Sequence, residues 1–291
     1  MACETHFLLS VSCMTYNQSS YITDTMKGFA MQQTDFPFIA VIVDDASTDG
    51  EQEVIRGHVD EHFNHSAESG FKEWETEDAF WTFARHKENK NCHFVVVFLK
   101  KNLYKQPKKK ETVIRDWMNS KYIALCEGDD YWTDPLKLQK QVDFLERHEE
   151  YSMCFHAADV KHEGGVDDPY RNGTHFLDLE DREYTSTELV SKWMLPTASI
   201  VYRKNLVENY QIKHPEWLVF GDIMLALKCS HTGKIYGMSD VMSVYRIQPN
   251  SVTNDTEFVD KTVFRLPDHY RCLRMNFPKV EKGIDDKIDV N

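Results

Sequence analysis

Apolar runs that alternate with helical patterns are the feature that most limits how this chain can fold. The runs of strand length are Phe7 to Met14, Phe38 to Val43, His93 to Leu99 and Tyr122 to Cys126. After the first of them, a helix is indicated by the spacing of Ile22, Met26 and Phe29. Strands that are apolar almost throughout are buried on both faces, so the alternation predicts a parallel, doubly wound α/β sheet.

A cluster of acids follows the fourth run. Glu127, Asp129 and Asp130 come directly after it, and a helix is expected after Asp134 and Pro135. Carboxylates this close repel one another unless a cation or hydrogen-bond donors offset their charge. Mg²⁺ or Mn²⁺, held by one or two carboxylates together with phosphate oxygens, is the simplest remedy. The alternative is a polar turn in which Asp134 caps the helix, but capping does not account for the acids ahead of it.

A second acidic turn, Asp44 to Gly50, follows the second run. A calcium loop of the EF-hand type is excluded because Arg56 stands where a bidentate Glu is required. Asp45 is expected to accept hydrogen bonds from a base or ribose, and Asp49 to cap the next helix. Because open parallel sheets bind ligands outside the carboxyl ends of their strands, both acidic turns are candidate parts of one site.

Other segments leave alternatives open. The loop after the third run carries lysines at positions 100, 101, 108, 109 and 110, which form a solvated face or meet phosphate. Residues 64–91 are interpreted as an insertion, with Ala79 to Ala84 as a short helix or an edge strand. Asp222 stands at a helix start, where an N-cap is the simplest interpretation.

The second half is less regular. One helix is expected from Ser186 to Trp193, capped by Ser186, and another from Trp217 to Ser230. A last strand is expected from Val241 to Ile247 and an amphipathic helix from Glu257 to Met275.

Composition narrows the class of protein. The 291 residues carry a formal net charge of −13, which argues against a general affinity for nucleic acid or anionic membranes. The seven cysteines form no CxxC pair and lie mostly in apolar runs, so they are expected to be reduced, buried thiols of a cytoplasmic protein. No apolar run is long enough to span a bilayer.

Five segments in this order carry a resemblance to a known family: SCMTYNQSSYI, VIVDDASTDG, YIALCEGDDYW, FGDIML and SVYRIQPNSVT. The chain resembles family-2 glycosyltransferases of the GT-A fold, which include bacterial enzymes that build surface polysaccharides. The resemblance covers roughly residues 5 to 250. It implies one GT-A domain over residues 1–291, with a nucleotide-sugar half to about residue 135, an acceptor half from about 136 to 275, and a charged tail from 276 to 291.

The resemblance also implies roles for single residues. Thr15 and Tyr16 would line the nucleotide site, and Asp45 would accept a hydrogen bond from the base, usually uracil. The family's D-x-D corresponds to Glu127-Gly128-Asp129, which implies a ribose contact for Glu127 and a metal contact for Asp129. The metal ligands implied are Asp129 and Asp130, because some relatives use the second acid of a D-D pair.

The last two of these five segments, FGDIML and SVYRIQPNSVT, contain the remaining residues of the implied site. Asp222 matches the family's general base, and Arg246 matches an arginine that approaches the diphosphate. Gln248 stands where the family often has histidine.

The expected protein is therefore an inverting glycosyltransferase that uses Mn²⁺ or Mg²⁺. It would transfer a sugar from a nucleotide-diphospho-sugar, with a leaning to UDP, to a hydroxyl of a saccharide or lipid-linked saccharide. A cytoplasmic location, at the inner face of the membrane or free of it, is expected. Two alternatives stay open: a catalytically silent sugar-binding scaffold on the same fold, and a metal-dependent nucleotidyltransferase, which the absence of a glycine-rich loop after the first strand disfavours.

Overall fold

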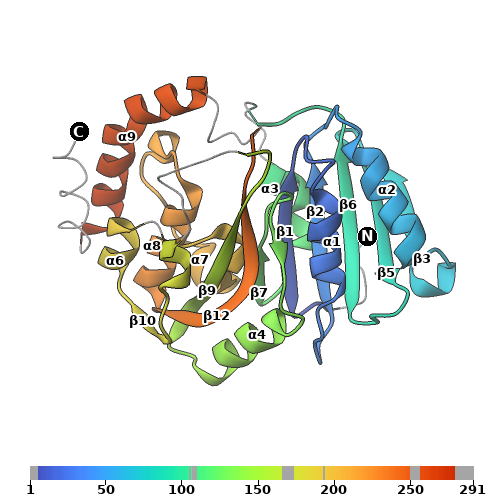
Figure 1. The fold of residues 1–291 in the computed structure, drawn as a ribbon, viewed down its shortest axis with the longest axis horizontal. Coiled ribbons are helices and arrows are strands. Elements are labelled where there is room, and N and C mark those ends of the chain that lie inside the picture. Colours follow the sequence, from blue (N-terminus) through green and yellow to red (C-terminus); the bar gives the residue numbers. More distant parts are fainter. Residues whose placement is uncertain are drawn as a thin grey trace. The chain divides into compact units, whose positions relative to one another are not determined.

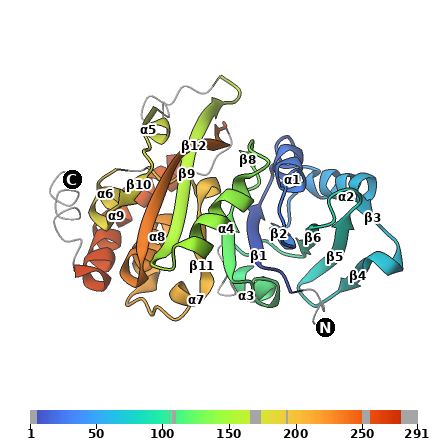
Figure 2. The same cartoon turned by 90° about the horizontal axis from the view of Figure 1, so that it is seen from below.

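The computed structural model describes residues 6–104, 106, 110–165, 174–192, 194–249 and 256–278. The chain divides into two compact units, both drawn in Figures 1 and 2. The first comprises Met1–Phe144, Thr197–Val201 and Met242–Tyr245, and the second comprises Leu145–Pro196, Tyr202–Val241 and Arg246–Asn291. Most of the tail expected from residue 276 lies outside the described residues.

Parallel strands form the centre of the first unit. They are β1 (Leu9–Thr15), β2 (Phe38–Asp44), β6 (Cys92–Leu99) and β7 (Tyr122–Leu125). They are hydrogen-bonded in the order β7-β1-β2-β6, and each neighbouring pair is parallel. Since the chain turns to one side of β1 to form β2 and returns to the other side to form β7, the sheet is doubly wound. The predicted α/β fold class is confirmed.

Helices cover both faces of these strands. In Figures 1 and 2, α1 (Ile22–Ala30) and α2 (Glu51–His62) lie on one face, and α3 (Lys110–Ile114) lies on the other. Every residue of β2 and β6 is buried, as two covered faces require. The predicted apolar face of α1 is confirmed, because Ile22, Met26 and Phe29 are fully buried.

The segment interpreted as an insertion extends the same sheet. β5 (Ala79–His86) pairs antiparallel with β6, and β3 (Phe63–Asn64) and β4 (Lys72–Glu75) pair antiparallel with β5. The strand alternative for Ala79 to Ala84 is therefore correct and the helix is wrong. A short turn suffices between β5 and β6 because antiparallel neighbours need no crossover.

Two late segments complete the first unit. The carbonyl oxygen of Ile200 accepts a hydrogen bond from Leu125 N at 3.1 Å, on the side of β7 away from β1. β8 (Tyr131–Trp132) pairs antiparallel with Ser243 and Val244. These pairings satisfy backbone groups that an open sheet edge would leave exposed.

The strands that lie wholly or partly in the second unit are β9 (Tyr151–His162), β10 (Arg182–Tyr184), β11 (Val201–Arg203) and β12 (Lys234–Ile247). Its helices are α5 (Thr174–Leu177), α6 (Ser186–Ser191), α7 (Lys204–Val207), α8 (Gly221–Thr232) and α9 (Thr256–Asn276), while α4 (Lys137–Arg147) begins in the first unit. α6, α8 and α9 pack around one apolar cluster that includes Val190, Leu227 and Leu273. Within the described ranges, no helix has both the length and the apolar character needed to cross a membrane.

Three expected boundaries in the second half are wrong. α8 begins at Gly221 rather than Trp217, because residues 215–217 form a separate 3₁₀ turn. β12 begins at Lys234 rather than Val241. The cap of α6 is Thr185 rather than Ser186: its hydroxyl accepts from Glu188 N, and the Glu188 carboxylate accepts from Thr185 N.

The cysteine side chains agree with expectation where they are described. All six are free and buried: Cys13, Cys92, Cys126, Cys154, Cys229 and Cys272. Burial raises the pKa of the Cys92 and Cys229 thiols, so these groups stay protonated and behave as small apolar side chains. Cys3 lies outside the described residues.

Candidate active site

Most of the predicted site residues lie at one edge of the sheet in the first unit. Because β1, β2 and β7 are parallel, their carboxyl ends share that edge. The residues that follow these ends are Thr15 and Tyr16, Asp45, and Glu127 to Asp130. β1 and β7 are neighbours at the point where the winding of the sheet reverses, which is where open α/β sheets bind ligands.

A buried carboxylate joins the loops after β1 and β2. Glu51, the first residue of α2, is fully buried and accepts hydrogen bonds from Gln18 N and Ser47 Oγ, both at 2.9 Å. Thr15 Oγ1 donates to its other carboxylate oxygen. Burial raises the pKa of Glu51, while these hydrogen bonds act in the opposite direction.

Further hydrogen bonds hold the two loops in register. Asn17 N donates to Ser47 Oγ at 2.8 Å, and Asn17 Oδ1 accepts from Thr48 N at 2.8 Å. Asn17 and Ala46 both have positive φ, at 54° and 60°, which lets each loop turn back tightly on its strand. The loops therefore form one connected structure rather than two independent turns.

The acidic turn after β7 packs directly on the loop after β1. A Cβ atom on Gly128 would overlap Thr15 Oγ1 and would lie 2.5 Å from Gln18 Oε1, so only glycine fits. Gly128 N donates to Met14 O at 3.1 Å. Thr25 Oγ1, from α1, lies 2.9 Å from Gly128 O and 2.6 Å from Asp130 O.

The acids of this turn differ in exposure. Glu127 is exposed, Asp129 is half-buried, and Asp130 is only 1 % exposed. Burial raises the pKa of the nearby Cys13 thiol well above its usual value. Four carboxylates raise it further, those of Glu51, Glu127, Asp129 and Asp130. The carboxyl end of β1 therefore lies in a concentrated negative field that favours a cation.

The carboxylates suit a metal site whose ligands come partly from the protein and partly from a bound substrate better than a site made of protein ligands alone. Within the described ranges no three His, Cys, Asp or Glu side chains are grouped closely enough to hold a metal ion. Mg²⁺ and Mn²⁺, however, are commonly bound by one or two carboxylates, with substrate phosphates and water completing the shell. Glu127 is exposed and Asp129 is half-buried, so both carry carboxylate oxygens that a bound ligand could reach.

Asp45 is engaged with the basic segment that follows β6. Its carboxylate is 1 % exposed, accepts a hydrogen bond from Leu103 N at 2.6 Å and forms an ion pair with Lys110 Nζ at 3.1 Å. Lys110 thus faces an acid of the site rather than forming part of a solvated face. Lys108 and Lys109 lie outside the described residues.

The other acids of these turns have structural partners. Asp44 accepts from Ser47 N and from Gln52 Nε2, and burial raises its pKa. The N-cap of α2 is Gly50, so the capping interpretation of Asp49 is wrong, although its Oδ1 accepts from Glu51 N at 3.1 Å. Asp134 accepts from Leu136 N at 2.8 Å, which agrees with the capping alternative for that residue.

Two predicted residues belong to the second unit. Asp222 lies in the first turn of α8, where its Oδ1 accepts from Ile223 N at 2.8 Å. The N-cap of that helix is Phe220, so the simple capping interpretation of Asp222 is wrong. Arg246 is 4 % exposed and its Nε donates to Glu163 Oε1 at 3.1 Å.

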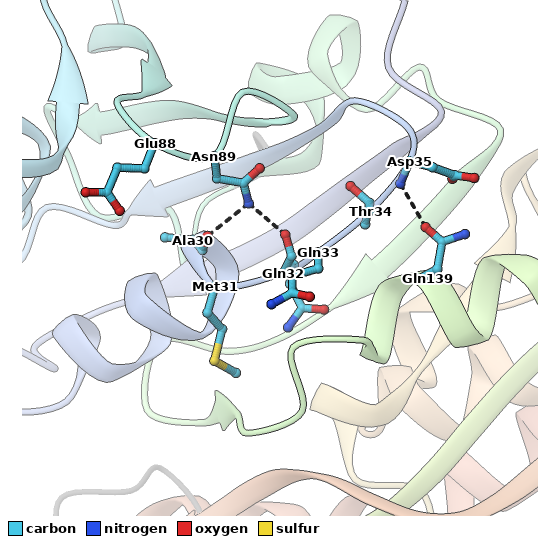
Figure 3. A pocket seen from close by; sticks show the side chains of 9 residues that line it. All are labelled: Ala30, Met31, Gln32, Gln33, Thr34, Asp35, Glu88, Asn89 and Gln139. Atoms are coloured by element: carbon cyan, nitrogen blue, oxygen red, sulfur yellow. Dashed lines mark hydrogen bonds between the residues drawn. The ribbon is translucent and has the colours of Figure 1, made fainter.

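A cavity of about 540 Å³ lies elsewhere in the first unit, at the amino ends of β2 and β6, and Figure 3 shows its lining. The polar side chains there serve the fold: Asn89 Nδ2 donates to the carbonyls of Ala30 and Gln32, and Gln139 Oε1 accepts from Asp35 N. The cavity is at the opposite ends of these strands from the acidic turns, so it is not part of the candidate site.

Glu51 and Lys110 were not identified by sequence reasoning. Glu51 directly follows the turn Asp44 to Gly50, but a Glu in the first turn of a helix ordinarily faces water. Lys110 stands in a run of like charges, and such a run usually lies on a solvent-exposed surface. Their burial depends on contacts with residues 33 to 65 positions away, which no local pattern reveals.

No family model matches the chain. The uncharacterized protein Rv1520 of Mycobacterium tuberculosis is 30% identical over 257 residues, which are 88% of this chain. The chain spans 63% of the length of that relative. The putative teichuronic acid biosynthesis glycosyltransferase TuaG of Bacillus subtilis is 22% identical over 268 residues, which are 89% of each chain.

Solved glycosyltransferases share the fold. S. aureus TarS, residues 1–349 in complex with UDP-GlcNAc, superposes with a TM-score of 0.63 at 17% identity, over 96% of this chain and 71% of that one. The mannosyltransferase PcManGT from Pyrobaculum calidifontis, in complex with GDP-Man and Mn²⁺, gives a TM-score of 0.57 at 14% identity, over 98% and 70%. The chain therefore has the GT-A fold, and the fold class predicted from its sequence is confirmed.

Proposed function

We propose that this chain, which has the GT-A fold, transfers a sugar from a nucleotide-diphospho-sugar to a hydroxyl of a saccharide or lipid-linked saccharide in surface-polysaccharide synthesis. The observation that carries the proposal is the set of accessible carboxylates at the point where the winding of the sheet reverses. The names of TuaG and of UDP-bound TarS support a polysaccharide product and a uridine nucleotide.

In this proposal the first unit binds the donor. Thr15 and Tyr16 line the nucleotide site and Glu127 contacts the ribose. Asp45 recognises the base, for which its buried ion pair with Lys110 must open. Asp129 is the better metal ligand of the two neighbouring aspartates because Asp130 is almost fully buried. A divalent cation bound there would offset the charge of the diphosphate as it leaves.

In the second unit, Asp222 is proposed as the general base. Its carboxylate lies in the first turn of α8 and is half-buried, and a carboxylate can accept a proton as a general base. The acceptor hydroxyl, once deprotonated, would attack the anomeric carbon opposite the diphosphate, so the configuration of the sugar would invert. Arg246 is proposed to balance charge on the diphosphate.

Titration calorimetry tests the donor site. UDP, GDP and CDP are titrated into the protein with Mn²⁺ and with EDTA, beside the variants Asp129→Asn and Asp130→Asn. One nucleoside diphosphate, expected to be UDP, should bind only with metal, and Asp129→Asn should weaken it by at least about tenfold. Equal binding in EDTA would exclude the metal, and no binding of any nucleotide would overturn the proposal.

A transfer assay separates an enzyme from a silent binding protein. Asp222→Asn should keep the nucleotide affinity but lower the turnover number by about 10² to 10⁴, the contribution typical of a general base. A wild-type protein that binds the nucleotide sugar tightly but transfers nothing to any acceptor would favour the scaffold alternative.

A further inference from the structure

Glu51 has no role in the proposed reaction, yet it is an unusual charged residue. Side chains of Glu are almost never fully buried unless they are paired, and this one is fully buried. Its hydrogen-bond donors within the described part of the chain are all neutral: Thr15 Oγ1, Gln18 N and Ser47 Oγ. Placing a charge there costs free energy, which a role in holding the surrounding loops would offset.

The donors to Glu51 come from two different loops. Thr15 and Gln18 belong to the loop after β1, which carries Tyr16, and Ser47 belongs to the loop after β2, which carries Asp45. One carboxylate therefore holds both nucleotide-facing loops. Its two oxygens can accept several hydrogen bonds at once, which a single hydroxyl or amide oxygen could not.

The residues that are hydrogen-bonded to Glu51 also contact the acidic turn after β7. Gly128 packs against Thr15 Oγ1 and Gln18 Oε1 so closely that a Cβ atom would collide with both. Thr15 Oγ1 also lies 2.8 Å from Gln18 Oε1, and its single proton can be donated either to this oxygen or to Glu51. A change in the position of Thr15 or Gln18 must therefore move Gly128, and with it Glu127 and Asp129.

We propose that Glu51 is a positioning residue of the donor site: through Thr15 and Gln18 it holds the acidic turn in the arrangement that binds a divalent cation and a nucleoside diphosphate together. The proposal rests on the proposed function. Glu51 itself touches neither ligand.

Two substitutions separate the hydrogen bonds of Glu51 from its charge. In Glu51→Gln, the amide oxygen can accept from Gln18 N and Ser47 Oγ, while the amide nitrogen donates to Thr15 Oγ1, whose proton is then directed at Gln18 Oε1 instead of residue 51. The shape and the hydrogen bonds survive without the charge. Glu51→Ala removes all three hydrogen bonds and leaves the buried Thr15 and the half-buried Gln18 and Ser47 without this acceptor.

Calorimetric titration of UDP with Mn²⁺ should distinguish these variants. Glu51→Ala should weaken binding by at least about tenfold, whereas Glu51→Gln should stay within about threefold of the wild-type protein. Ser10→Ala is the matched control, because Ser10 is also fully buried in this unit and hydrogen-bonded, to Ser120 Oγ and Trp117 O. It should lower the melting temperature without changing the dissociation constant.

Amide hydrogen exchange, measured by NMR on the protein without nucleotide or metal, tests the same idea independently of the reaction. Glu51→Ala should speed exchange at Gln18 N and also at Gly128 N, with which Glu51 has no hydrogen bond. Glu51→Gln and Ser10→Ala should leave Gly128 N protected. Unchanged exchange at Gly128 N in Glu51→Ala, or wild-type affinity in that variant, would overturn the positioning role. If the wild-type protein binds no nucleotide, the proposed function fails, and the exchange at Gly128 N still decides whether Glu51 holds the turn.

Discussion

Asp45 carries a negative charge that is withdrawn from water and balanced by a lysine from a distant part of the chain. The carboxylate is 1% exposed and Lys110 is 21% exposed. Removing one partner of a buried ion pair leaves the other uncompensated, which costs far more than the loss of a surface pair. The basic segment after β6 is therefore part of the candidate site, although its composition resembles that of a solvated loop.

Lys110→Met should lower the free energy of unfolding by about 2 kcal/mol, because among the described residues the Asp45 carboxylate would keep only the hydrogen bond from Leu103 N. Lys100→Met is the matched control, since Lys100 pairs with the exposed Glu75. It should cost less than about 1 kcal/mol. Urea unfolding of both variants measures the difference, and equal losses would show that the Asp45 pair behaves as a surface pair.

Two glycines of the first unit should respond in opposite directions to alanine. In Gly128→Ala the new Cβ would overlap Thr15 and Gln18, so stability should fall and metal-dependent nucleotide binding should be lost. Gly57 lies in the interior of α2, where an added Cβ atom would have nothing within 4 Å, so Gly57→Ala should raise stability by up to about 1 kcal/mol. Thermal unfolding tests both, and a stable, nucleotide-binding Gly128→Ala protein would contradict the packing described for the turn.

At the scale of elements, α2 and β5 bring three histidines together. The ring centroids of His58 and His62 are 4.5 Å apart, and the ring of His86 stacks on His62 at 6.4 Å. Burial is the largest cause, with His62, Lys27 and His86 adding to it, and together they lower the pKa of His58 from 6.5 to about 4. The unfolded chain takes up this proton near pH 6.5 and the folded chain only near pH 4, so acid favours unfolding over that range.

Stability should therefore fall as the pH drops from 6.5 to 4, with a contribution from His58 of up to about 3 kcal/mol. In His58→Leu this part of the pH dependence should disappear. His148→Gln, at a half-exposed site in the second unit, is the control. Urea unfolding across this pH range measures the effect, and an unchanged slope in His58→Leu would show that the imidazole is not the group that titrates.

The long apolar strands and their acidic ends could be predicted from the sequence because burial on both faces leaves a local pattern. β2 is buried along its whole length and is followed directly by Asp45, and the apolar run that contains β7 is followed directly by Glu127 to Asp130. The two-residue strands β3 and β8 have no such pattern, since they exist only through pairing with distant partners. The burial of Glu51 could not be predicted for the same reason.

At the scale of the whole molecule, the net charge of −13 sets the field in which an anionic donor must bind. The chain has 47 Asp and Glu residues against 34 Lys and Arg residues, and acidic residues are also concentrated in the turns after β2 and β7. Such a field attracts a divalent cation and repels a diphosphate, so ordered binding, metal before or with nucleotide, is the physical expectation.

The affinity for Mn²⁺ alone should therefore weaken several-fold between about 10 mM and 150 mM ionic strength, because salt shortens the range of this field. The affinity for UDP in EDTA, if measurable, should become stronger as the ionic strength rises. Calorimetry at several salt concentrations gives both. A metal affinity that does not respond to salt would mean that only the nearest ligands determine binding.

The first unit is not continuous in sequence, because residues 197–201 and 242–245 belong to it. The carbonyl of Ile200 accepts a hydrogen bond from Leu125 N on the side of β7 away from β1, and Ser243 and Val244 pair with β8. A gene fragment that ends near residue 144 would lack both pairings and leave the strand that precedes the acidic turn with an open edge. Recombination with a related gene at that point would join the proposed donor-binding part to edge segments from another protein. Donor preference should therefore be inherited together with the second half of the chain rather than exchanged as a module.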